Sequence, residues 1–351
     1  PAANGIDGTV GASGGLSGGS GGSVSIVNNN NGGITLTNAN DVTAAAPLTG
    51  AGDGGKIILN AAGGGAALAG DITIPFGTMD VNAKGASFNG GTLDITGRNF
   101  VSPGVGPLNL IANATGSGNG GTVKFTTTSN TSDLTVGGGG DDSLCINATG
   151  GSAGSGAGDG GSISVIAGRN VTVNNDPACL NAVALGTNGA GANLTLKAGN
   201  GASGDLFVDL SLNASGKGTG AGGAIALQTN SSSTFNIGTG SVSPGVNGTL
   251  TAVGGTGVGA GGGSVSVVNS GSGGIKLDAT TSIDVASSAA GGDGGSIALD
   301  ASSGTLTIPV AGAVGSPTST LNASATGPGT YKGGLIRLNG NDIQTLGSNP
   351  L

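Results

Sequence analysis

The chain has 351 residues, of which 80 are Gly, and it carries 10 basic against 18 acidic residues for a net charge of −8; every acid is Asp. With no Glu, His or Trp, and with Gly opposing helix by about 1 kcal/mol per residue, the composition excludes a helical protein and histidine-based chemistry. The negative charge also disfavours nucleic-acid binding, which requires clustered Lys and Arg.

Glycine at this level is typical of flexible linkers, but two other features indicate a folded chain. Charged residues make up only 8% of the sequence and hydrophobic residues 36%, which is the reverse of a disordered composition. The apolar residues also occur in short alternating bursts. We therefore interpret the glycines as corners of a folded repeat.

The repeat begins with a partial unit and continues in chain order. Residues 5–10 form an alternating burst that resembles the third strand of the later units. The main signal follows, a Gly pair and an alternating strand, with a tenth copy at 192–196 that has lost its second Gly. The nine complete copies are 22–26, 55–59, 91–95, 121–125, 161–165, 223–227, 263–267, 295–299 and 334–338.

Two further bursts fall between successive copies. Second strands are expected at 34–36, 72–74, 134–136, 171–173, 235–237, 275–277 and 306–308. Third strands, with the pattern apolar-Asn-Ala, are expected at 81–83, 146–148, 180–182, 212–214 and 321–323. Three short strands in each unit of 30 to 40 residues fit one triangular coil of a parallel β-helix.

We therefore predict an all-β fold, a parallel β-helix (β-solenoid) of about ten triangular coils without helices, forming one domain over residues 1–351. An antiparallel sandwich is the alternative, but hairpins would not repeat strand types in threes. Alternation places one set of side chains in the core and their neighbours outside, and glycine is expected to supply positive φ at the corners. The predicted inward residues include Ile57, Leu59, Ile163, Val165, Ile225 and Leu227, and the predicted outward residues Lys56, Ser164 and Ala226.

The two ends of the repeat carry the functional prediction. Residues 1–20 supply a third strand alone, and residues 334–351 supply a first and a second strand without a third. Uncapped solenoid ends are templates for pairing, so we expect a head-to-tail homopolymer that grows as an open filament. Ten coils at about 4.8 Å predict an axial rise near 48 Å per subunit. The expected subunit interface comprises Ile6, Val10, Leu16, Val24, Ile26, Leu335, Ile336, Leu338, Ile343 and Leu346.

The alternative is that the chain is trimmed from a longer surface adhesin that binds glycans or host surfaces through a solenoid face. No charged start followed by an apolar run is present at the first residues, so we expect a mature chain whose leader has been removed.

Cys145 and Cys179 are the only cysteines, and each directly precedes an apolar-Asn-Ala third strand. Equal positions in consecutive coils lie about 5 Å apart, within disulfide range. We therefore expect an outward-facing disulfide and an exported protein; two free thiols at unrelated positions are the alternative.

Other polar residues give no catalytic pattern. Asp53, Asp159 and Asp293 precede Gly pairs, where a turn-forming role is favoured over calcium binding because tandem ligand spacing is absent. Asp141 and Asp142 are adjacent acids, and Arg98 and Arg169 share a Gly-Arg-Asn corner in coils that are not neighbours. We expect no enzyme activity, no cofactor and no metal.

Four Asn residues that begin Asn-x-Ser/Thr motifs fall on third strands. Asn113, Asn147, Asn213 and Asn322 lie within a residue or two of one position in the repeat. We interpret them as a stacked polar ladder rather than as glycan acceptors.

The strand at 295–301 and the Gly-Arg-Asn continuation at 168–173 resemble repeats of large secreted bacterial β-helix proteins, of which the filamentous-haemagglutinin-like adhesins are the best-known example. The resemblance covers essentially the whole chain. It implies secretion to the cell surface and a role in adhesion, biofilm or fibre formation. The chain is shorter than these adhesins and lacks their N-terminal secretion cap, which favours a repeating fibre subunit.

Overall fold

The structure is a computed structural model of the chain. It describes residues 9–346 except 16–17, 31, 48–49, 63–69, 153–155, 201, 241–243 and 310–319. Of the expected interface residues, Ile6, Leu16 and the side chain of Leu346 lie outside the described residues.

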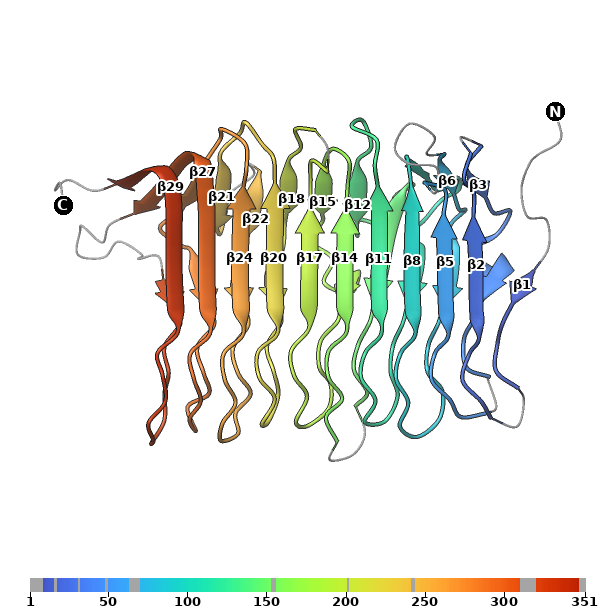
Figure 1. Cartoon of the computed structure of the whole chain (residues 1–351), viewed down its shortest axis with the longest axis horizontal. Coiled ribbons are helices and arrows are strands. Elements are labelled where there is room, and N and C mark those ends of the chain that lie inside the picture. The colour runs from blue at the N-terminus through green and yellow to red at the C-terminus, as the bar shows by residue number, and fades with distance from the viewer. Residues whose placement is uncertain are drawn as a thin grey trace.

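Parallel strands stack side by side along one axis, from β2 near the N-terminus to β29 near the C-terminus (Figure 1). This first face consists of β2 (Ser23–Val27), β5 (Lys56–Asn60), β8 (Thr92–Gly97), β11 (Thr122–Thr127), β14 (Ser162–Ile166), β17 (Asn193–Lys197), β20 (Ala224–Thr229), β24 (Ser264–Asn269), β27 (Ser296–Pro309) and β29 (Leu335–Leu346).

The two remaining faces are built from shorter strands. The second face comprises β3 (Ile34–Thr35), β6 (Ile72–Thr73), β9 (Phe100–Val101), β12 (Leu134–Val136), β15 (Val171–Val173), β18 (Leu206–Val208), β21 (Phe235–Gly238), β22 (Gly245–Asn247), β25 (Ile275–Leu277) and the later parts of β27 and β29. The third face comprises β1 (Val10–Gly11), β4 (Val42–Thr43), β7 (Gly77–Asp80), β10 (Leu108–Ile111), β13 (Ser143–Asn147), β16 (Leu180–Asn181), β19 (Leu212–Asn213), β23 (Leu250–Thr251), β26 (Ser282–Asp284) and β28 (Thr320–Asn322).

The fold is an all-β parallel β-solenoid of about nine turns. This agrees with the prediction of about ten coils, because ten first-face strands enclose nine complete turns. We keep the word coil for each first-face strand with the segments that follow it, and number the coils 1 to 10. The described residues contain no α-helix; the one helical turn is the 3₁₀ segment η1 (Ala39–Asp41). No described helix is long and apolar enough to span a membrane.

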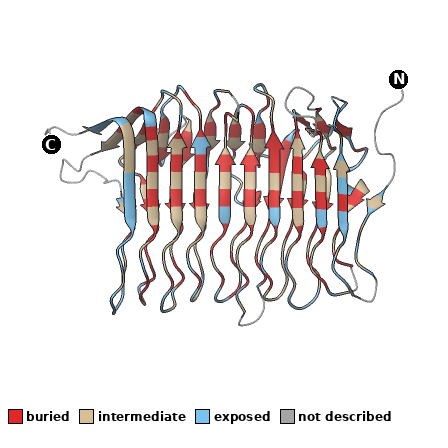
Figure 2. Ribbon diagram, viewed as in Figure 1, coloured by how far each residue is buried: buried red, intermediate tan, exposed pale blue. Residues whose placement is uncertain are grey.

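The alternation read from the sequence places the core correctly. Ile57, Leu59, Ile163 and Val165 are completely buried, whereas the outward Lys56 is exposed. Figure 2 shows the result as buried bands that alternate with partly exposed ones along the first-face strands. Each inward side chain packs on its equivalent one coil away, as Ile57 does between Val24 and Leu93. The stacked columns therefore form one continuous hydrophobic core.

Glycine supplies positive φ at several turns, as expected, for example at Gly33, Gly137 and Gly274, but the Gly pairs have another role. None of the pairs has a positive φ; the glycines that do lie elsewhere. Gly54 instead faces the carbonyl oxygen of Val81 in the next coil so closely that a Cβ would overlap it, and Gly91 faces the carbonyl oxygen of Gly55 in the same way. The Gly pairs are thus required for close backbone approach between coils.

Candidate functional site: the two ends of the solenoid

The C-terminal end presents a long unpaired strand edge. β29 pairs with β27 along one side, and its other side has no partner within the described chain. Ile336 and Ile343 continue the inward columns of Ile297 and Leu306, yet they are 41% and 48% exposed. The apolar columns of the core are therefore open at this end.

Two other predicted interface residues lie on the same strand. Leu338 also continues an inward column and is partly buried. Leu335 aligns with Ser296 on the outer side of the first face and is 64% exposed. Leu335 therefore lies at the rim of this end rather than in its apolar column.

The N-terminal end presents three shorter edges. β1, β2 and β3 pair with β4, β5 and β6, respectively, and their other sides lack partners among the residues that the structure describes. Val24 and Ile26 head the inward columns of Ile57 and Leu59. Val24 is buried, while Val10 and Ile26 are partly buried, so this end shows less apolar surface than the other.

The strand types at the two ends are complementary. β1 belongs to the third face and precedes the first strand of the first face. At the other end, β29 supplies first-face and second-face pairing, whereas the last described third-face strand, β28, pairs one coil earlier with β26. Among the described residues, the final coil therefore has two faces, and the first described strand belongs to the face that this coil lacks.

Aspartates before the Gly pairs hold the corner between the third and first faces. Asp53, Asp159 and Asp293 each accept a backbone N–H from the next coil, donated by Asn89, Ala190 and Lys332 at 2.7–2.8 Å. Asn89 and Asn119 continue the chain of bonds between Asp53 and Asp159. We call Ser20, Asp53, Asn89, Asn119 and Asp159 the first corner ladder. These aspartates therefore link neighbouring coils rather than form the local turns that were expected.

The residues directly before the second-face strands form a second corner ladder: Asp71, Asn99, Asp133, Asn170 and Asp205. The backbone N–H of Asn170 donates to Asp133 at 3.0 Å, and that of Asp205 donates to Asn170 at 2.8 Å. Carboxylates and amides alternate along this ladder. Because like charges directly opposite each other on neighbouring strands are destabilising, the alternation separates the carboxylates by two strand spacings.

The two Gly-Arg-Asn corners supply the cations of this ladder. Arg98 donates from Nε and Nη2 to the two carboxylate oxygens of Asp71 at 2.9 and 3.0 Å, and Arg169 binds Asp133 in the same bidentate way. These hydrogen bonds lower the pKa of the Asp71 and Asp133 carboxyls, against the opposing effect of partial burial. Both arginines are thereby engaged in ion pairs with corner residues.

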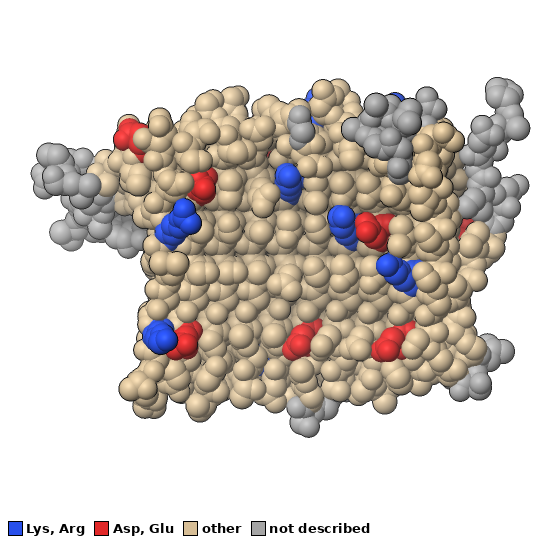
Figure 3. Space-filling model, in the orientation of Figure 1, with Lys and Arg blue, Asp and Glu red and all other residues tan. Residues whose placement is uncertain are grey.

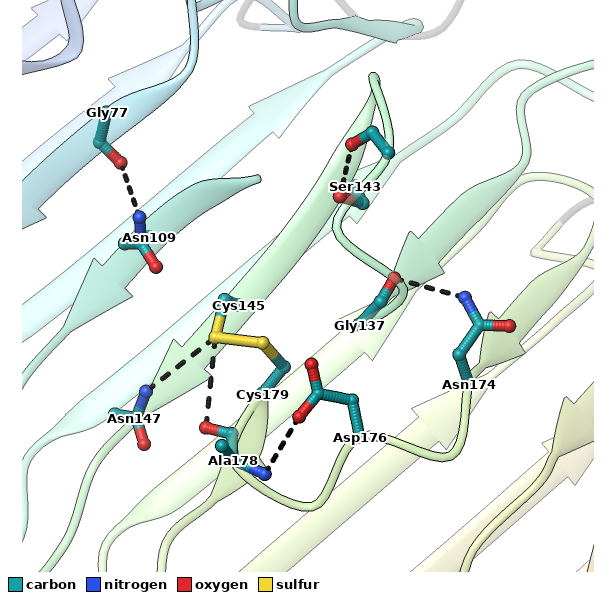
Figure 4. Close-up of a disulfide and its surroundings, with 11 residues drawn as sticks. Gly77, Asn109, Gly137, Ser143, Cys145, Asn147, Asn174, Asp176, Ala178 and Cys179 are labelled. Atoms are coloured by element: carbon teal, nitrogen blue, oxygen red, sulfur yellow. Dashed lines mark hydrogen bonds between the residues drawn. A yellow bond between two sulfur atoms is a disulfide. The ribbon is translucent and has the colours of Figure 1, made fainter. Parts of the chain in front are cut away.

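The two cysteines lie at bonding distance from each other in the structure (Figure 4). Their Cα atoms are 4.1 Å apart, and pairing of Ile146 with Leu180 places them at equal positions in coils 4 and 5. They occupy an outer position of the third face but are only 7–8% exposed. The carbonyl oxygen of Ala178 lies 3.8 Å from the sulfur of Cys145, so the bridge is covered rather than open to solvent.

The expected polar ladder on the third face is present in part: Asn213, Thr251, Asp284 and Asn322 share one column, and Nδ2 of Asn322 donates to Asp284 at 3.1 Å. Asn147 aligns with Asn181, and Asn322 with Asp284, whereas the backbone N–H of Asn113 donates to Asn82 at 2.6 Å, at a different position in the coil. Asn213 and Asn322 also accept the N–H two residues later in their own chain. These side chains cap local turns because that acceptor geometry needs no neighbouring coil.

The absence of Glu now has a structural explanation. Asp80, Asp284 and Asp300 each accept the backbone N–H two residues further on, at 2.7–3.0 Å. Asp142, the single described non-Gly residue with positive φ, accepts the N–H of Ser102. Short Asp side chains reach nearby backbone groups in this way. Most carboxylates therefore serve the backbone, and neither Asp141 nor Asp142 forms an ion pair among the described residues.

The sequence did not reveal a fully buried Asn in the wall of coil 8. Asn269 is 0% exposed and makes four hydrogen bonds. Its oxygen accepts the N–H groups of Ser231 and Gly271, and its nitrogen donates to the carbonyls of Ser233 and Gly274. The alternation of the strand could have indicated this burial. Asn269 stands at the end of β24, at an inward position where an apolar residue is expected.

The first face carries few charges. Figure 3 shows Lys, Arg and Asp side chains scattered over it among uncharged ones. One described pair on this face, Lys124 and Asp94, approaches to 4.0 Å. This surface has no concentration of one sign of charge that would mark a binding site.

Comparisons of the chain with models of known protein families, with curated proteins and with solved structures find no match. The class of the protein is therefore defined by its strand pairing, as a parallel β-solenoid repeat protein.

Proposed function

We propose that the chain is a non-enzymatic structural subunit that assembles head to tail into an extracellular filament. The observation that carries the proposal is the fit between the two ends. Continuing the observed register by one strand places Val24 and Ile26 of the next copy on Ile336 and Leu338. Val24 and Ile26 are the first residues of the two inward columns, and Ile336 and Leu338 are the last. The core would then run through the joint without interruption.

The other two faces support the same joint. On the second face, Ile34 of the next copy would stack on Ile343, since both occupy the position of Ile72 and Leu306. On the third face, β1 of the next copy would lie between β28 and its own β4, completing the coil that has two faces. Burying a large apolar side chain contributes about 1.5–3 kcal/mol, and new strand pairing satisfies the open edges.

A joint of this kind uses different surfaces on the two partners, so it propagates as an open filament unless rotation closes a ring. The disulfide supports an oxidising, extracellular location. The resemblance of the repeats to those of filamentous-haemagglutinin-like proteins fits a surface fibre. We include a relationship to that family in the proposal.

Electron microscopy and analytical sedimentation of the purified chain test the proposal. Filaments with an axial repeat near 48 Å, ten strands at about 4.8 Å, are expected. Ile336→Asp places a charge in the joint and should leave monomers. Ile166→Asp, at an outward position in the middle of the solenoid, is the matched control and should still form filaments. A wild-type chain that stays monomeric at high concentration contradicts the proposal.

A second candidate, glycan binding through a solenoid face, is favoured by a groove of about 570 Å³ on the third face near the N-terminal end. The residues that line it include the polar Thr43, Asp80 and Lys84 and the apolar Ala46 and Pro47. Pockets with an apolar lining and a few polar groups are typical of small-ligand sites. A glycan array probed with wild type and Lys84→Ala tests it: binding that the variant loses supports this function, and an array without signal contradicts it.

A further inference from the structure

The last strand carries an acceptor in the same column as the second corner ladder, separated from it by Thr234, Gly274 and Thr305. Asp342 aligns with Thr305, and Ile343 with Leu306. Asp342 therefore occupies, in coil 10, the position that Asp133 and Asn170 occupy in coils 4 and 5.

The hydrogen bonds of this ladder run in one direction. The side chain of Asp133 receives the N–H of Asn170, and the side chain of Asn170 receives the N–H of Asp205. Each acceptor thus takes a donor from the coil that follows it. For Asp342, that coil lies beyond the edge of β29.

The carboxylate of Asp342 has capacity for this donor. Its Oδ2 accepts Nε2 of Gln344 at 2.6 Å, and within the described chain its Oδ1 receives no hydrogen bond. Asp342 is also exposed at the open edge. An ionised carboxylate can accept several hydrogen bonds.

The same ladder position begins with a donor at the opposite end. Gly33 directly precedes β3, and pairing of Ile34 with Ile72 places Gly33 opposite Asp71. Gly33 has φ of +73°, and a Cβ there would overlap the carbonyl oxygen of Asp71. Its backbone N–H has no acceptor among the described residues. One end therefore offers an acceptor, and the other offers a donor at the matching position.

The first corner ladder does not provide such a pair. Its last position, directly before β29, is occupied by Lys332, whose N–H donates back to Asp293. A Lys side chain has no acceptor. Of the two corner ladders, the second is therefore the one that offers a polar link across the joint.

We propose that Asp342 is the residue that fixes the register of the joint, through a hydrogen bond from the backbone N–H of Gly33 of the next copy to its carboxylate. The inference rests on the proposed head-to-tail assembly and names its specificity residue. A slip of one residue would lose this bond and turn the inward side chains outward.

The test compares Asp342→Leu, which removes the acceptor, with Asp342→Asn, which keeps an acceptor oxygen as Asn170 does. Hydrogen bonds to charged groups make larger net contributions than neutral ones. We expect Asp342→Leu to raise the critical concentration for filament formation by about ten-fold or more, and Asp342→Asn to change it by less than about three-fold. Asp94→Leu, which removes an outward carboxylate from coil 3, is the matched control and should leave it unchanged.

Thermal unfolding of each variant at concentrations below assembly shows whether the subunit itself is intact. An unchanged critical concentration for Asp342→Leu overturns the role of Asp342 while the filament proposal stands. An equal loss in Asp342→Asn overturns the acceptor role in favour of simple charge. A wild-type chain that forms no filaments overturns both proposals.

Discussion

The backbone N–H of Asn170 donates to Oδ1 of Asp133 across 3.0 Å, linking one coil of the solenoid to the coil before it. The same carboxylate binds Arg169, the residue that precedes Asn170 in the chain. A corner of this solenoid is therefore held by two side chains and one backbone N–H from two coils, in addition to the strand ladders on either side.

These corner carboxylates predict a specific loss of stability in acid. The pKa of Asp71 and Asp133 is lowered in the folded state, below the value near 3.9 of an unfolded chain. Their contribution is therefore complete above about pH 4–5 and is lost as pH falls through the lowered pKa. The double variant Asp71→Asn/Asp133→Asn loses both ion pairs and should melt about 1–4 °C below wild type at pH 6. The expected effect is small because both carboxylates are more than a third exposed.

Melting temperatures of wild type and this variant between pH 6 and pH 2 check the prediction. The two curves should converge below pH 4. A constant difference down to pH 2 would show that the carboxyl charge is irrelevant at these corners.

The Gly pairs predict a steric penalty. Gly54→Ala should lower the free energy of unfolding by about 2–3 kcal/mol or more, as overpacking does, because its Cβ would overlap the carbonyl oxygen of Val81. Gly140→Ala is the control, since a Cβ at Gly140 would meet no heavy atom within 4 Å and the residue has no positive φ. Chemical denaturation measures both. Equal stability of the two variants would contradict the close-approach explanation.

These glycines also show which parts of the fold the sequence could predict. The inward columns of Ile57 and Leu59 were predictable because period-two alternation is visible in five residues. Strands of two residues, such as β4 and β9, are too short to show it. The reason for Gly54 was missed because close approach depends on the next coil, which no local pattern describes.

The candidate sites likewise include features that could be predicted from the sequence and features that could not. The register of Cys145 and Cys179 was predictable because both precede the same motif. The corner ladders were not, because loops of variable length hide which Asp and Asn residues lie one coil apart. Asn113 was placed in the wrong column for this reason.

The disulfide predicts a large effect of reduction. In the chain-entropy description, a bridge with a sequence separation of 34 stabilises by about 3–4 kcal/mol. In chemical denaturation, the free energy of unfolding of the double variant Cys145→Ser/Cys179→Ser should be lower than that of wild type by this amount. A reductant should not change the stability of the double variant further. Intact mass without reduction should be about 2 Da below that of the fully reduced chain, from the loss of two hydrogens. Two free thiols in the wild type would refute the pairing.

The stability of the fold should depend on the hydrogen bonds of the buried Asn269 side chain. Asn269→Leu keeps the approximate size but leaves the backbone groups of Ser231, Gly271 and Gly274 unsatisfied, at a cost of about 3 kcal/mol. Gln228→Leu, on an exposed position of β20, should change stability by less than about 0.5 kcal/mol. Denaturant midpoints separate the two. A neutral Asn269→Leu would mean that packing alone holds this corner.

The filament proposal predicts that subunit length sets the axial repeat. Ser162 aligns with Asn193, and Asn193 with Ala224, so deleting residues 193–223 removes one coil and joins two equivalent positions. Both ends remain unchanged, and the joint should form as before. Because each coil contributes one strand spacing of about 4.8 Å, the repeat should fall from about 48 to about 43 Å. Fourier analysis of filament images measures this difference, with wild type in the same preparation as reference. An unchanged repeat would mean that copies associate laterally or through other surfaces, because only stacking along the solenoid axis couples the number of coils to the repeat.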